Sequence, residues 1–262
     1  MSTVVKKSTT GAAKVSVKWL DAYNRDGYFI FPQLLPAELV KELSAAAEAL
    51  TQQVGPLVNE NPRVRVDQTK QGVRIRKVEP LIDISEPFAR LSRNPLVTGL
   101  LETLFGEAPV LFEDKLNYKY PEGGSEFQMH QDWFYWQDFS PRLTTALIYL
   151  DDATAENGCL EVIPGWHTRG LLHSNSAATY KERQKMAAEV WQDQVPTLAP
   201  GKAGTVLLFS CMTPHMSKAN LSNKARRAII LTYNPVSDGA HYEDAAGKGR
   251  DAARAWVTAA TK

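Results

Sequence analysis

Three residues of metal-binding types stand out by their spacing: His130 and Asp132, separated by one residue, and His215 far downstream. Side chains two positions apart in an extended chain point to the same side, so the imidazole and the carboxylate can meet at one point. His215 lies where one predicted strand ends and another begins. Two histidines and one carboxylate leave three coordination positions open, which suits Fe(II) oxygenases. We therefore predict that these three residues are metal ligands and form the catalytic centre.

A His-x-Asp pair alone is weak evidence, since an isolated strand histidine is more often simply hydrogen-bonded. Arg226 strengthens the case for an oxygenase site, because it lies on the predicted strand that follows His215. A guanidinium there can form a two-pronged ion pair with a carboxylate in a dry pocket, and 2-oxoglutarate carries one at C5. Neighbours on a strand face opposite ways, so only one of Arg226 and Arg227 can reach the pocket, and spacing favours Arg226.

The first hundred residues are predicted to be mainly helical. Apolar residues at helical spacing and Pro36 at the start predict a helix to Gln53, and further helices are expected at 17–26, 86–93 and 95–105. Tyr28 to Phe31 and Val73 to Val78 are predicted strands, and the charged segment from Asn59 to Gln71 is predicted to be a loop.

From Pro109 the pattern changes to short strands separated by turns. They are predicted at 110–112, 115–120, 127–130, 144–150, 159–163, 205–210 and 228–233, with a helical interruption at 177–192. The predicted fold is α+β, mainly β: a double-stranded β-helix (jelly roll, cupin-like) buttressed by N-terminal helices. We expect a flexible tail at 1–16 and one domain at 17–262, divided into a helical part (17–108), the jelly-roll core (109–236) and a C-terminal tail (237–262).

Composition excludes several classes of partner. Thirty basic and twenty-nine acidic residues give a net charge of +1 with no basic cluster, so nucleic acid is not expected. No apolar run is long enough for a membrane span, and the N-terminus lacks the apolar core of a signal peptide. Two cysteines fit a reducing cytoplasm, where we expect a monomer or homodimer acting on a small molecule.

The sequence resembles the phytanoyl-CoA dioxygenase family of iron(II)/2-oxoglutarate oxygenases. The resemblance rests on segments in family order: Leu116-Asn117-Tyr118-Lys119, His130-Gln131-Asp132-Trp133, Leu150 to Thr154, Glu156-Asn157-Gly158, Val162 to Gly165, and His215 through Arg227. One departure is Trp166, between Gly165 and His167, where the family usually has serine.

The resemblance implies Fe(II), 2-oxoglutarate and O₂ as cofactor and cosubstrates. It implies that His130, Asp132 and His215 bind the iron. It also implies that Arg226 and Ser217 hold the C5 carboxylate, while Asn117 and Trp136 contact the same cosubstrate. Halogenating relatives lack the carboxylate, so the presence of Asp132 favours hydroxylation of an unactivated C–H bond, with release of succinate and CO₂.

The residues that bind the substrate are indicated less clearly by the sequence. Arg74, Arg76 and Lys77 form a basic stretch that is more often a solvated face, but one of them could grip an anionic group. Trp133 could wall the pocket, although strand aromatics usually belong to the core. The remaining histidines (His167, His173 and His241) are taken as structural or surface residues, and Cys211 as a small buried hydrophobe.

Two other functions use the same residues. A Zn(II) hydrolase also needs three protein ligands and a water, but it gives no reason for Arg226. A jelly-roll binding module could keep the fold without turnover. Other oxidative outcomes, such as desaturation or ring formation, are not distinguished by the ligand set.

Overall fold

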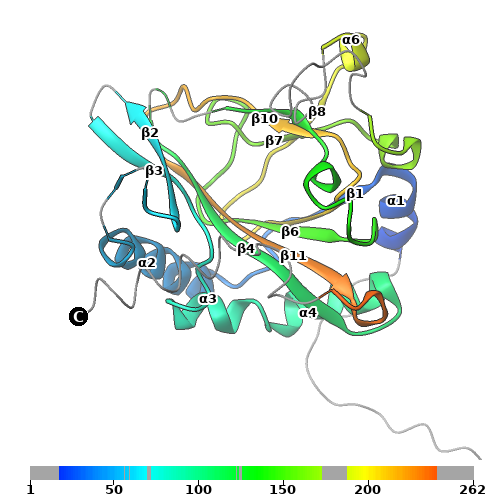
Figure 1. Cartoon of the computed structure of the whole chain (residues 1–262), viewed down its shortest axis with the longest axis horizontal. Coiled ribbons are helices and arrows are strands. Elements are labelled where there is room, and N and C mark those ends of the chain that lie inside the picture. Colours follow the sequence, from blue (N-terminus) through cyan, green and yellow to red (C-terminus); the bar gives the residue numbers. More distant parts are fainter. Residues whose placement is uncertain are drawn as a thin grey trace, which may run out of the picture.

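Two antiparallel sheets form the centre of the structure, a computed structural model that describes residues 18–55, 57–58, 60–69, 72–121, 123, 126–172 and 188–240. The major sheet has the order β1-β9-β6-β11-β4-β3-β2, and the minor sheet β5-β10-β7-β8 (Figure 1). The major-sheet strands are β1 Tyr28–Phe31, β2 Val64–Thr69, β3 Gly72–Val78, β4 Pro109–Lys119, β6 Thr144–Tyr149, β9 Val206–Ser210 and β11 Arg226–Pro235. The minor-sheet strands are β5 Phe127–His130, β7 Leu160–Val162, β8 Thr197–Ala199 and β10 His215–Ser217.

The central strands are buried on both faces, and alternation assigns each side chain to one of two cores. In β6, Ile148 packs toward the helices while Leu147 and Tyr149 pack toward the minor sheet. In β11, Ile229 and Ile230 divide in the same way. This double burial explains why these strands are continuous apolar runs rather than alternating ones.

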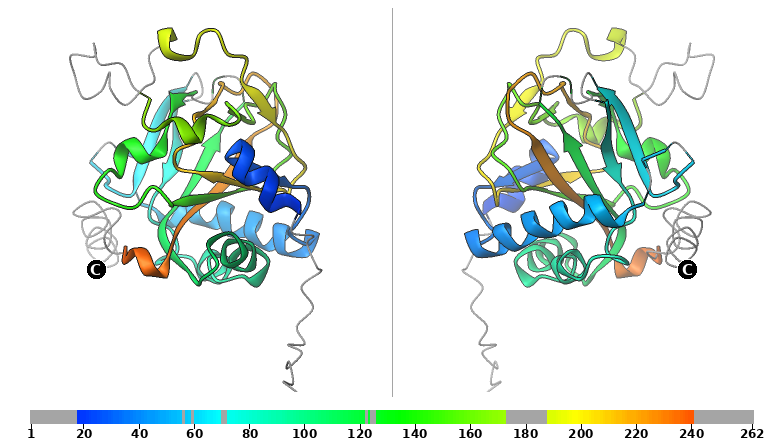
Figure 2. Two further views of the ribbon diagram at one scale, coloured as in Figure 1. Left: turned by 90° about the vertical axis from the view of Figure 1, so that its right-hand side faces the viewer. Right: turned by 90° about the vertical axis from the view of Figure 1, so that its left-hand side faces the viewer.

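Helices cover the outer face of the major sheet. They are α1 Lys18–Asp26, α2 Ala37–Gln53, α3 Glu86–Leu91 and α4 Pro95–Phe105; α2 to α4 lie together beneath the sheet in Figures 1 and 2. In α2 the buried positions Val40, Leu43, Ala47 and Leu50 recur at helical spacing. The predicted jelly roll with buttressing helices is confirmed, and β1, β2 and β3 add to it as the two edges of the major sheet.

Two strand predictions were wrong in the region that builds the site. The segment predicted as a loop contains β2, an antiparallel partner of β3 whose many charges suit its position at the sheet edge. The two strands predicted at 110–112 and 115–120 are one strand, β4. Its register with β11 shifts between Thr232 and Tyr233, leaving Phe112 unpaired, and this bulge obscured the continuous strand.

Short elements were also missed or only partly located. β8 and β10 have three residues each and were not predicted, because alternation cannot be recognised over so few positions. Of the helix predicted at 177–192, the structure describes α6, Ala188–Trp191. Several predictions lie outside the described residues: the N-terminal tail (1–16), the C-terminal tail beyond residue 240, most of that helix, His173 and His241. Three 3-10 helices complete the fold: η1 Asp132–Tyr135, η2 Trp166–Arg169 and η3 Val236–Asp238.

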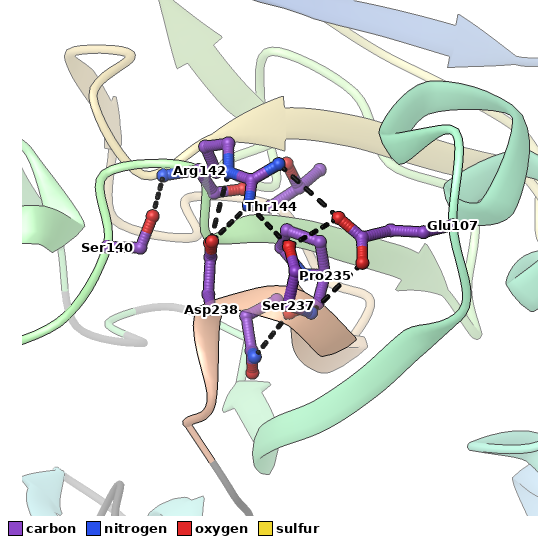
Figure 3. Close-up of polar contacts among 8 residues, drawn as sticks. Glu107, Ser140, Arg142, Thr144, Pro235, Ser237 and Asp238 are labelled. Atoms are coloured by element: carbon purple, nitrogen blue, oxygen red, sulfur yellow. Dashed lines mark hydrogen bonds and ion pairs between the residues drawn. The ribbon is translucent and has the colours of Figure 1, made fainter.

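A polar cluster joins the end of β11 to the rest of the domain (Figure 3). Arg142 donates from Nε to Asp238, 3.2 Å away, and from a terminal nitrogen to the Ser237 hydroxyl, 2.9 Å away. Glu107, after α4, accepts hydrogen bonds from both the backbone and the hydroxyl of Ser237. In the part of the chain that the structure describes, no helix is long and apolar enough to cross a membrane.

Candidate active site

The three predicted metal ligands converge at one end of the minor sheet. His130 ends β5, His215 begins β10, and the two residues are directly paired across these antiparallel strands. One ligand atom from each of the three side chains lies within 4.8 Å of the others. Asp132 Oδ1 is 3.5 Å from His130 Nε2 and 3.7 Å from His215 Nε2.

Asp132 reaches the cluster in a different way from the predicted extended strand. It is the first residue of η1, and only Gln131 between the two ligands is extended, with φ −116° and ψ 129°. That single extended residue is enough to keep His130 and Asp132 on one side. The Gln131 side chain donates to the Met212 carbonyl, 2.7 Å away, and so ties this turn to the segment that carries His215.

Both histidines are oriented by backbone carbonyls. His130 Nδ1 lies 2.7 Å from the Gln128 carbonyl oxygen, and His215 Nδ1 lies 2.9 Å from that of Thr213. Donation from Nδ1 leaves a lone pair on each Nε2, the atom that faces Asp132. Burial, and then the neighbouring His130, lower the pKa of His215 to about 4, so its imidazole is neutral at neutral pH.

Asp132 stays ionised although it is buried. Burial opposes its charged form, but the two histidines outweigh burial and hold the pKa of this carboxyl below its usual range. Two imidazoles and one carboxylate form the donor set that Fe(II) accepts with positions left for cosubstrate and O₂. This is the one group of three or more potential metal-binding side chains found among the described residues.

A cavity of about 310 Å³ opens beside these ligands, within the size range of small-molecule sites. All four residues predicted to contact 2-oxoglutarate line it: Asn117, Trp136, Ser217 and Arg226. Asn117 lies on β4 and Arg226 on β11, two paired strands of the major sheet. The cavity therefore lies between the sheets, with His130 and His215 supplied by the minor sheet, Asp132 by η1, and Arg226 by the major sheet.

Arg226 is buried and has no carboxylate partner among the described residues. One terminal nitrogen donates to the Gly158 carbonyl, and Nε has no hydrogen-bond partner there. Burial lowers the pKa of this guanidinium. The Oδ1 atom of Asn117, also buried at the cavity, lacks a partner too. Such unsatisfied buried groups are costly in a closed protein and are expected where a ligand completes the hydrogen bonds.

Tyr149 connects the two sheets beside this arginine. Its ring centroid is 5.9 Å from the Arg226 guanidinium carbon. Its hydroxyl donates to the Ala199 carbonyl on β8, 2.9 Å away, and accepts from the Leu160 backbone amide on β7 at 2.9 Å. A residue of the major sheet thus holds two strands of the minor sheet at the cavity.

Gly158 is required where it accepts the Arg226 hydrogen bond. Its φ is +76°, and a Cβ at this position would lie 2.2 Å from the Lys218 carbonyl oxygen. No other residue type fits without moving the backbone next to Ser217.

The three predicted substrate residues do not line the cavity. Arg76 stacks on the Phe127 ring, 4.5 Å from its centroid, and Arg74 donates to the carbonyl of its own strand neighbour, Val73. Trp133 donates to the Phe139 carbonyl and packs in the cluster of Phe112, Trp136 and Phe139, of which Trp136 lines the cavity. These residues were selected for charge and aromaticity, whereas strand pairing decides which side chains face the cavity.

Sequence reasoning missed several residues that do line it, chiefly Glu113, Lys115 and Phe127, whereas Lys77 was among the basic residues considered for an anionic group. A signal was present for two of them. Glu113, Lys115 and Asn117 alternate along β4 and therefore share a face. The unrecognised bulge at Phe112 hid that relationship.

A jelly roll with two histidines and a carboxylate beside a cavity with a buried arginine defines a non-haem iron(II), 2-oxoglutarate-dependent oxygenase. Comparison with known proteins agrees. The family model "Phytanoyl-CoA dioxygenase (PhyH)" matches residues 23–228. The chain belongs to this family, and it is an Fe(II)/2-oxoglutarate-dependent dioxygenase of the hydroxylase type, as the sequence predicted.

Relatives of known activity cover nearly the whole chain. The methylphosphonate hydroxylase of Gimesia maris is 31% identical over 84% of this chain and 81% of its own. The L-proline trans-4-hydroxylase of Streptomyces griseoviridis is 30% identical over 86% and 89%. The crystal structure of EctD from S. alaskensis with 2-oxoglutarate and 5-hydroxyectoine matches with a TM-score of 0.70 and 27% identity, over 90% of this chain and 81% of that one.

Proposed function

We propose that the protein hydroxylates an unactivated C–H bond of a small molecule while 2-oxoglutarate is converted to succinate and CO₂. In this reaction one atom of O₂ enters the new hydroxyl group and the other enters the succinate carboxylate. The observation that carries the proposal is the buried, carboxylate-free Arg226 in the same cavity as the three metal ligands. A dicarboxylic cosubstrate would supply the missing partner.

The three predicted metal ligands would hold the iron and fix its position. His130, Asp132 and His215 would hold Fe(II), which supplies O₂ activation when bound together with 2-oxoglutarate. The hydrogen bonds from each Nδ1 to a carbonyl fix both rings with Nε2 toward the metal position. The single negative charge of Asp132 would neutralise part of the metal charge in this buried site.

Arg226 and Ser217 would receive the C5 carboxylate, with Asn117 and Trp136 beside the cosubstrate chain. Because Arg226 already donates to the Gly158 carbonyl, its guanidinium plane is fixed before the cosubstrate arrives. Preorganisation of this kind reduces the ordering cost of binding. Trp136, with its ring edge against Phe112 at 5.4 Å between centroids, forms a rigid apolar wall.

Turnover is the direct test. Anaerobically iron-loaded protein would be exposed to air with 2-oxoglutarate and a panel of small acids, amino acids and phosphonates, and succinate would be measured. We expect at least one compound to stimulate succinate formation in equal amount with a product one oxygen atom heavier. The Asp132→Ala variant should lose both products while remaining folded. Activity supported by zinc in place of iron, or an Asp132→Ala variant with full activity, would contradict the proposal.

A further inference from the structure

Two lysines face the cavity from neighbouring strands and are not explained by iron or 2-oxoglutarate binding. Lys77 lies on β3 and Lys115 on β4, and both line the cavity. Lys77 is paired with Asn117 in the register of β3 with β4, so the two lysines lie on adjacent strands and only two positions apart. Their side chains are 28% and 16% exposed, which is unusual for lysine and calls for compensating charge.

Glu79 and Glu113 do not balance these lysines fully, and Asp132, the other carboxylate acting on Lys115, belongs to the predicted metal site. Lys77 forms an ion pair with Glu79, and Lys115 Nζ is 2.7 Å from Glu113 Oε2. The Glu79 and Glu113 carboxyl groups also hydrogen-bond to each other. Such a hydrogen bond requires a shared proton, so below about pH 7 these four residues hold two ammonium groups and fewer than two carboxylates.

The pKa values agree with that distribution of protons. Burial, with the neighbouring Glu79 adding to it, raises the pKa of Glu113 to about 7. Burial also opposes ionisation of Glu79, but Lys77 and Lys115 outweigh it and lower its pKa to about 2. The shared proton therefore belongs to Glu113, the member of the pair that lines the cavity.

Lys115 and Arg226 lie at opposite ends of the cavity, and Lys77 lies between their levels. Along the paired strands β4 and β11, Arg226 is level with Lys119, whereas Lys115 is level with Ile230. Four residues of antiparallel strand correspond to about 14 Å. A 2-oxoglutarate molecule held by Arg226 therefore leaves the Lys115 end free. Trp136, which would contact the cosubstrate, also borders this end, with its ring centroid 5.8 Å from Lys115 Nζ.

We propose that Lys77 and Lys115 bind the anionic head group of the substrate, and that the substrate is a compact phosphonate or carboxylate. This inference rests on the proposed function and specifies its substrate class. The cavity, at about 310 Å³, is at the lower end of the range for small-molecule sites, so a bound cosubstrate leaves room for a small second molecule only. Held at the lysines, such a molecule directs its remaining carbon atoms along the apolar wall toward the metal ligands.

Calorimetric titration without O₂ tests the inference independently of turnover. Iron-loaded protein saturated with 2-oxoglutarate would be titrated with methylphosphonate, propionate and dimethyl methylphosphonate, the uncharged ester. At least one of the two anions, methylphosphonate or propionate, should bind. If methylphosphonate binds, its uncharged ester should bind at least about tenfold more weakly. The preference between methylphosphonate and propionate identifies the head group. Failure of both anions to bind, or equal binding of methylphosphonate and its ester, would overturn the inference.

Variants locate the site. Lys115→Met and Lys77→Met should each weaken binding of the preferred anion by about tenfold or more, since each removes a charge-assisted hydrogen bond to the head group. Affinity for 2-oxoglutarate should be unchanged in both. Lys202→Met, at an exposed lysine paired with Asp152, is the matched control. Lys77→Met keeps the test valid if Lys115→Met does not fold, and wild-type anion affinity in folded Lys77→Met would overturn the assignment.

The two proposals fail in different ways. Anion binding without succinate formation by any panel compound contradicts the proposed function and leaves the lysine site intact. Succinate formation with a neutral compound, combined with no anion binding, contradicts the lysine site and leaves the proposed function intact.

Discussion

Arg226 and Arg227 are adjacent in β11 and serve opposite faces of the major sheet. Arg226 turns into the cavity with no carboxylate partner in the described structure, whereas Arg227 turns toward the helices and binds Asp151 through two nitrogens, at 2.9 and 2.8 Å. Arg227 also donates to Glu48 of α2 at 2.8 Å. The same residue type, one position apart, therefore faces the cavity in one case and joins a strand to a helix in the other.

This pair gives the first prediction. Arg226→Met should raise the KM for 2-oxoglutarate roughly 100-fold, because the cosubstrate carboxylate would be left buried and unpaired. Its melting temperature should stay the same or rise, since an uncompensated buried charge is removed. Arg227→Met should lower stability by about 1–2 kcal/mol and leave that KM unchanged. Steady-state kinetics and thermal unfolding of both variants measure this, and a reversed pattern would show that the two roles were assigned the wrong way round.

Gly158 gives the second prediction. Gly158→Ala should destabilise the protein by about 2–4 kcal/mol and weaken 2-oxoglutarate binding, because the added Cβ would displace the Lys218 carbonyl beside Ser217. Gly106 is the matched control: its φ is +72°, but a Cβ there meets nothing within 4 Å. Gly106→Ala should cost only about 1 kcal/mol of conformational strain and leave cosubstrate binding intact. Equal effects of the two variants, measured by unfolding and titration, would rule out crowding as the cause.

Glu113 gives a pH-dependent prediction. Its pKa is raised to about 7, so the folded protein binds a proton that the unfolded chain releases near its ordinary glutamate value. The stabilising contribution of that proton is complete below the unfolded pKa and is lost as pH rises through about 7. Glu113→Gln removes this dependence. The wild-type free energy of unfolding, relative to that of Glu113→Gln, should fall between pH 5 and 7.5 by on the order of 2 kcal/mol and then level off.

The comparison with the variant is needed because Lys119 has the opposite effect. Burial, together with Arg226, lowers its pKa to about 7, so its contribution to stability increases with pH above that value. Both proteins contain Lys119, and its effect cancels in the difference. Chemical denaturation across this pH range provides the measurement. A difference that is constant with pH would show that Glu113 is already ionised at pH 5.

The cluster in Figure 3 gives a stability prediction remote from the cavity. Arg142→Ala should lower stability by about 1 kcal/mol, because Asp238, Ser237 and Glu107 would lose a shared donor whose own side chain is 48% exposed. High salt should reduce the difference from wild type. The KM for 2-oxoglutarate should not change. A loss of cosubstrate affinity would mean that the end of β11 influences the cavity.

The metal ligands and Arg226 could be predicted because their chemistry depends on residue type and order along the chain. Local pattern also predicted the apolar strands β6 and β9 and the helix α2. The lysine end of the cavity was found only in part. Lys77 was named within its basic stretch, but its position beside Lys115 depends on the pairing of β3 with β4, which residue periodicity does not show. Asp132 illustrates the same limit, since its position was predicted but the 3-10 turn that creates it was not.

The hydrogen bonds of Tyr149 should affect how closely the consumption of 2-oxoglutarate is coupled to oxidation of the substrate. His130 and His215 belong to one sheet and Arg226 to the other, and the Tyr149 hydroxyl holds the sheets together beside Arg226. A Phe at position 149 would keep the ring but free β7 and β8 to shift relative to β11. The span between the iron and the guanidinium would then vary from molecule to molecule, and 2-oxoglutarate would be consumed in turnovers that leave the substrate unoxidised.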